Sequence, residues 1–176
     1  RVLSNPDDDV NLLRILNTPR RGFGRKALEY FRSLADTKRC SLNSAMNSIR
    51  FSEDPSVPDK LKREVSDFLS LLDFYREKTS EPKRLAETVT SLIDNLDYWT
   101  YLVIEHQKNE KLAKWKYGNL VRFTEIIRRW ENDPDTEAFN LYSFLNRITL
   151  ITRDDDADEE DGKGGKVNLM TIHSAK

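Results

Sequence analysis

The stretch "LKREVSDFLSLLDFY" (residues 61–75) carries the most regular hydrophobic pattern in the chain. Its apolar positions are separated by four, three, four and three residues, at Leu61, Val65, Phe68, Leu72 and Tyr75. Because an α-helix has about 3.6 residues per turn, this spacing places all five side chains on one face. The stretch therefore predicts an amphipathic helix that packs against other helices.

Stripes with the same period extend outward from this segment in both directions. They cover residues 10–16, 28–35, 85–96, 120–130 and 141–151. Ser41 is predicted to cap a short helix over 41–49, Pro19 to end the first helix, and Pro82 to stand at a helix start. Proline-rich and polar residues predict loops between these elements. The pattern as a whole predicts an all-α, multi-helix bundle.

Length and composition bound the class of protein. The chain has 176 residues, of which 38% are hydrophobic and 34% charged, which is typical of one soluble domain. No apolar run approaches the roughly 18 residues of a membrane span, and the chain does not open on a secretory leader. One cysteine and two histidines cannot form an internal disulfide or a standard zinc site. We therefore expect a cytoplasmic protein without a membrane partner or a metal centre.

The net charge of −1 conceals a strong separation of charge along the chain. Residues 14–39 carry a local charge of +6, whereas residues 154–161 contain seven acidic side chains and no basic one. A basic segment favours a polyanionic partner, and an acidic run is typical of a solvated loop. Residues 154–166, which are acidic and then glycine-rich, are accordingly predicted to form a flexible loop.

The stretch "NTPRRGFGRKALEYF" (residues 17–31) places a glycine pair at the start of a predicted helix. It is no dinucleotide loop, because Ala27 stands where G-x-G-x-x-G requires glycine and a helix precedes it. Gly22 and Gly24 let successive backbone N–H groups converge on an anion near the helix N-terminus. The surrounding cations are Arg20, Arg21, Arg25 and Lys26. The pattern favours a phosphate-binding loop, and a plain interhelical turn is the alternative interpretation that stays open.

Other candidate motifs are weaker or absent. "GKGGK" (residues 162–166) lacks the spacing of a P-loop, and no acid–base or nucleophile–base pair can be argued from spacing, so no catalytic residue is predicted. Trp115 and Tyr117, with lysines on either side, form a second basic and aromatic patch that could meet nucleic acid. "VNLMTIH" (residues 167–173) predicts a buried strand that would belong to a neighbouring α/β domain.

Two segments resemble the UvrD/PcrA/Rep-type superfamily 1A ATP-dependent DNA helicases. "NPDDDVNLLRILNTPRRGFG" (residues 5–24) is similar to the opening of their 2B subdomain, and "VNLMTIHSAK" (residues 167–176) is similar to their motif V. The resemblance implies a helical 2B subdomain over 1–153, a loop over 154–166, and the start of the motif V strand of the second RecA-like (2A) domain over 167–176. The chain would then be a piece of a larger protein.

The resemblance also implies roles for individual residues. The family's Gly-Ile-Gly loop contacts duplex DNA ahead of the fork, which assigns duplex contact to Gly22, Phe23 and Gly24 and to the cations beside them. Phe23 replaces the family's isoleucine, and we expect its side chain to pack beneath the loop. The motif V positions Thr171, His173 and Lys176 would couple ATP hydrolysis to movement of single-stranded DNA. Lys116 stands where relatives usually have arginine.

The sequence and the resemblance together predict a regulatory, swivelling subdomain of a 3′-to-5′ DNA helicase in repair or replication. Its partners would be double-stranded DNA at the fork, through backbone contacts, together with repair or replication proteins. Single-stranded DNA, ATP and Mg would be bound by the parent protein, since this segment carries no cofactor site. Two alternatives stay open: a protein-interaction module that does not grip DNA, and part of a RecB/AddA-type helicase–nuclease subunit.

Overall fold

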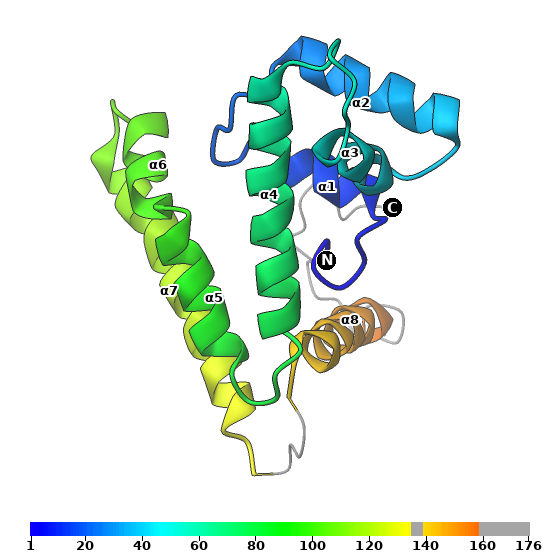
Figure 1. Ribbon diagram of the computed structural model, residues 1–176. Helices are drawn as coiled ribbons and strands as arrows, with labels where there is room; N and C mark the ends of the chain where they lie inside the picture. The colour runs from blue at the N-terminus through cyan, green and yellow to red at the C-terminus, as the bar shows by residue number, and fades with distance from the viewer. Residues whose placement is uncertain (135–138, 159–176) are drawn as a thin grey trace. The chain divides into compact units, whose positions relative to one another are not determined.

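The computed structural model describes residues 1–134 and 139–158, and all regular secondary structure in these ranges is helical (Figure 1). The helices are α1 (Asp9–Ile15), α2 (Arg25–Lys38), α3 (Leu42–Arg50), α4 (Asp59–Lys78), α5 (Leu85–Asn95), α6 (Tyr98–Glu105), α7 (Glu110–Glu131) and α8 (Leu141–Asp158). The all-α prediction is confirmed for this part of the chain. The strand predicted over 167–176 lies outside the described residues.

Two compact units divide the chain, residues 1–144 and residues 145–176, so that α8 begins in the first and continues in the second. Helix α8 reaches Asp158, and residues 154–158 are therefore helical where the sequence predicted a loop. Helix propagation adds one hydrogen bond for each residue fixed. The helix that begins in the apolar stripe over 141–151 therefore continues into the acidic run. The rest of the predicted loop lies outside the described residues.

Helix α4 has the buried stripe that its sequence predicts. Val65, Phe68, Leu72 and Tyr75 are all buried, and α4 packs against α3 and α5 (Figure 1). A continuous apolar core joins α4 to α1, α2 and α3, and it contains Leu12, Phe23, Phe31, Met46 and Ile49. This core holds the segment between α1 and α2 against α4.

Helices α5, α6 and α7 pack on one another and bury Leu85, Leu102, Ala113 and Ile127. The first turn of α5 has no cap from its own N-cap residue, Arg84. Instead, the backbone N–H of Ala86 donates to the buried carboxylate of Glu131, at the end of α7, with an N–O distance of 2.9 Å. A charge-assisted bond of this kind satisfies an N-terminal amide of α5 and fixes α5 against α7.

Helix boundaries test the predictions from single residues. The predicted Ser41 cap is confirmed, because its hydroxyl accepts from the Ser44 N–H at 3.2 Å. Pro82 does not begin a helix: Lys83 follows with a φ of 56°, and α5 starts at Leu85. A left-handed residue cannot continue a right-handed helical turn, which delays the start of α5 beyond the proline.

Candidate nucleic-acid interface

The candidate site is the loop of residues 17–24 between α1 and α2, called here the glycine loop. Gly22 adopts a φ of +82°, a left-handed conformation that favours glycine, and the Gly24 N–H donates to its carbonyl at 2.8 Å. Asn17 braces the loop from within: its amide nitrogen donates to the Phe23 carbonyl, and its amide oxygen accepts from the Arg21 N–H at 3.3 Å. The loop is thereby folded back on the end of α1.

The N-terminus of α2 is left without a cap. Gly24 is the N-cap residue and has no side chain to accept a hydrogen bond, and no described side chain takes its place. The backbone N–H groups of residues 25–27 therefore lack acceptors in the structure. Together with the positive end of the helix dipole, these amides form a candidate anion-binding site.

Phe23 lies beneath the loop, as expected. Its side chain is only 1% exposed and makes edge-to-face contacts with Phe31 of α2 and Phe68 of α4, at centroid distances of 5.6 and 5.9 Å. Such contacts add to the free energy gained by burying the ring. The Phe23 side chain thus anchors the backbone of the glycine loop to the core.

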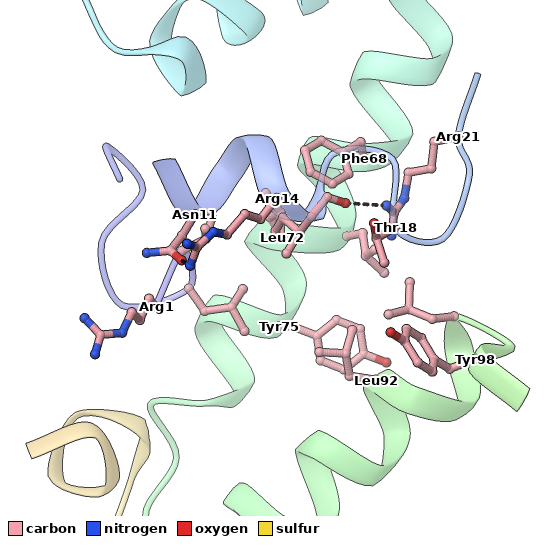
Figure 2. Close-up of a pocket in the computed structure, with 15 residues that line it drawn as sticks. Arg1, Asn11, Arg14, Thr18, Arg21, Phe68, Leu72, Tyr75, Leu92 and Tyr98 are labelled. Atoms are coloured by element: carbon pink, nitrogen blue, oxygen red, sulfur yellow. Dashed lines mark hydrogen bonds between the residues drawn. The ribbon is translucent and has the colours of Figure 1, made fainter. Parts of the chain in front are cut away.

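The side chain of Arg21 is turned back onto the end of α1. Its Nη1 donates to the carbonyl of Ile15 at 2.8 Å, a bond that Figure 2 shows, and to that of Pro19 at 3.2 Å. The guanidinium carbon lies 5.1 Å from the centre of the Phe68 ring. Burial lowers the pKa of Arg21 from its ordinary value. This cation is used in capping the C-terminus of α1, where the helix dipole favours positive charge.

Replacing Arg21 by alanine is expected to lower the free energy of unfolding by about 2 kcal/mol, because the α1 carbonyls lose a charged donor. Arg20→Ala is the matched control, since the Arg20 side chain is 87% exposed and should change stability by less than about 0.5 kcal/mol. Urea unfolding followed by circular dichroism measures both values. Equal stability of the two variants would contradict a structural role for Arg21.

The remaining three predicted cations are all exposed: Arg20 in the glycine loop, and Arg25 and Lys26 in the first turn of α2. Arg20 lies 3.9 Å from Glu105 of α6, and Arg25 lies 3.5 Å from Glu29 of α2. Exposed ion pairs of this kind contribute little, so they leave the cations available to a stronger polyanion. The first turn of α2 thus carries two exposed positive side chains beside its uncapped amides, and a third exposed cation lies in the glycine loop.

Sequence reasoning missed two residues that lie at the glycine loop. The carboxylate of Glu64, on α4, lies against Gly22, and its Oε1 is 3.8 Å from the Nζ of Lys60 one turn earlier. No local pattern could have found them, because α4 meets the loop only through the tertiary fold. Lys60 is thereby linked to the loop through Glu64.

The second basic and aromatic patch does not assemble as a single surface. Trp115 is exposed on α7, whereas the Tyr117 ring packs edge-on against Trp99 of α6 at 5.4 Å. Residues two apart on a helix point in different directions, which separates the two rings. The motif V positions Thr171, His173 and Lys176 lie outside the described residues.

A largely apolar cavity of about 410 Å³ lies behind the glycine loop (Figure 2). Thr18 and Arg21 line it from the loop, Leu72 and Tyr75 from α4, and Leu92 from α5. Within residues 1–134 and 139–158 there is no group of three or more histidine, cysteine or acidic side chains that could hold a metal ion. No helix in the same ranges is both long and apolar enough to cross a bilayer.

The described residues thus form a helical domain in which a glycine loop leads into a helix N-terminus that carries exposed cations. The family model of the UvrD-like helicase C-terminal domain matches residues 1–176, and the chain belongs to this family. The helicase resemblance of the sequence is confirmed at this level.

Named relatives agree with the family. The ATP-dependent DNA helicase PcrA of Staphylococcus aureus (strain Mu50) is 28% identical over 176 residues. The PcrA helicases of Bacillus subtilis (strain 168) and Staphylococcus epidermidis are 27% and 29% identical. Each alignment covers 100% of this chain but 23% of the relative, so the chain spans about a quarter of the length of these helicases.

Proposed function

We propose that this chain is the duplex-contacting, swivelling 2B subdomain of an ATP-dependent 3′-to-5′ DNA helicase that acts in repair or replication. One observation carries the proposal: the uncapped α2 N-terminus carries two exposed cations and follows a loop with a third, in a member of a helicase family. Backbone amides and flexible cations match the phosphates of a duplex without reading its bases. The expected activity is weak binding of double-stranded DNA, independent of sequence.

The glycine-loop residues divide into two roles in this proposal. Arg20, Arg25 and Lys26 contact phosphates directly, together with the backbone at Gly22 and Gly24. Arg21 and Phe23 position the loop, because one caps α1 and the other fills the core. Thr171, His173 and Lys176 are assigned, as the sequence predicts, to coupling with single-stranded DNA. ATP and Mg are proposed for the longer protein, and the cytoplasm for its location.

The salt dependence of duplex binding tests this function. Contacts to three phosphates should release the counterions bound there, so log K should fall against log salt concentration with a slope of about −3. Anisotropy of a fluorescent blunt duplex, titrated at several salt concentrations without nucleotide, measures the slope. Two duplexes of unrelated sequence should bind alike. A slope near zero, or no duplex binding at low salt, would contradict the proposal.

A second candidate function is a protein-interaction module that regulates unwinding without gripping DNA. It is favoured by one surface: Trp115, Arg122 and Ile126 are exposed at helical spacing on α7, away from the buried side of that helix. A wild-type chain that binds no duplex DNA at low salt would favour this function over the first.

A further inference from the structure

At Gly22 the glycine loop lies against one carboxylate of α4, that of Glu64. The Oε1 of Glu64 lies 2.8 Å from the position that a Cβ atom on Gly22 would occupy, and its Cδ and Oε2 lie 3.3 Å from it. A side chain at residue 22 would therefore require the end of the Glu64 side chain to shift. Glycine is favoured here by its positive φ, and the carboxylate fills the space beside it.

The carboxylate adds a negative charge beside the Gly22 backbone of the loop. Among described residues, Lys60 is the one ion-pair partner of Glu64, at 3.8 Å, and no described group donates a hydrogen bond to it. Asn17, Arg21 and Phe23 hold the loop by their own contacts. None of these contacts involves Glu64, so we expect the loop to keep its conformation without it and the charge of Glu64 to be its main effect.

The side chain of Glu64 is 25% exposed. Little protein therefore separates its negative charge from a molecule that binds the loop. A phosphate drawn to the Gly22 side of the loop would stand beside the carboxylate, and like charges at close range repel. Lys60 opposes this repulsion, because the same side chain can pair with either anion.

We propose that Glu64 limits the affinity of the glycine loop for duplex DNA by competing with a DNA phosphate for the loop and for Lys60. The proposal rests on the function proposed above and adds a regulatory residue to the same site. The two side chains have opposite effects on the affinity: Lys60 strengthens the phosphate contact, and Glu64 weakens it. A contact held weak in this way can be released and remade as a duplex moves past.

The test compares three variants of the full chain in duplex binding by fluorescence anisotropy. Glu64→Gln removes the charge with almost no change of shape and should lower Kd about threefold at moderate salt, as expected for one like charge removed at several ångströms. Glu64→Ala removes the contact as well and should also tighten binding. Glu77→Gln is the matched control, since Glu77 is exposed on the same helix and the change in net charge is identical.

The outcomes separate this inference from the proposed function. If wild type binds the duplex and both Glu64 variants bind no more tightly than Glu77→Gln, the affinity-limiting role is overturned and the proposed function stands. Weaker binding by both Glu64 variants, with unchanged thermal unfolding, would overturn it too and assign Glu64 a supporting role. If wild type, Glu64→Gln and Glu77→Gln all fail to bind at low salt, the proposed function fails, and this inference with it.

Discussion

Phe23→Ala is expected to lower the free energy of unfolding by about 4 kcal/mol, the largest effect of any single change at the site. The ring is 1% exposed and contacts Phe31 and Phe68, so its loss leaves a cavity between the loop, α2 and α4. Neighbouring side chains relax only partly into such a cavity, which adds to the lost burial energy. Because the ring anchors the loop, duplex binding should be lost as well.

Urea unfolding measures the stability change, and Phe51→Ala provides the matched control. Phe51 is 77% exposed, so the same chemical change there should cost less than about 0.5 kcal/mol. Phe23→Ile, which keeps a large apolar side chain under the loop, should recover most of the stability, to within about 1.5 kcal/mol of wild type. A Phe23→Ala variant as stable as Phe51→Ala would contradict the anchoring role of the ring.

The helices that could be predicted from sequence are those that bury one face. α4 follows its stripe because Val65 and Leu72 point to a core that lies along one side of it. α6 was not predicted, since "YWTYLVIE" is apolar on most sides and has no clear helical period. The extent of α8 was underestimated for a different reason: composition favoured a loop where helix propagation prevailed.

The candidate site was predicted by residue type but not by individual role. Four cations around a glycine pair look equivalent in sequence, yet Arg21 turns inward to the carbonyls of α1 and Arg20 points to solvent. That difference depends on where α1 ends and where Phe68 of α4 lies, and the tertiary structure determines both. Glu64 and Lys60 could not be predicted for the same reason. Sequence thus located the loop, and packing decided which side chains face outward.

Combined replacement of Arg20, Arg25 and Lys26 by alanine is expected to weaken duplex binding about a hundredfold near physiological salt. Each lost phosphate contact removes the release of about one counterion, so the salt slope should fall toward zero at the same time. Stability should change little, because all three side chains are exposed. Arg21 is kept in this variant, since its removal would disturb α1 and confuse a folding defect with a binding defect.

The matched control replaces Lys111, Arg122 and Arg129, three exposed cations of α7, by alanine. It changes the net charge of the chain by the same amount, so a loss of binding caused only by overall charge would appear equally in both variants. If the glycine loop is the duplex site, the control should keep most of the affinity and a slope close to that of wild type. The opposite pattern, with binding lost in the control and kept in the loop variant, would move the DNA-binding surface to α7. Because both variants remove the same number of cations from exposed positions, the comparison depends on where those charges lie on the fold.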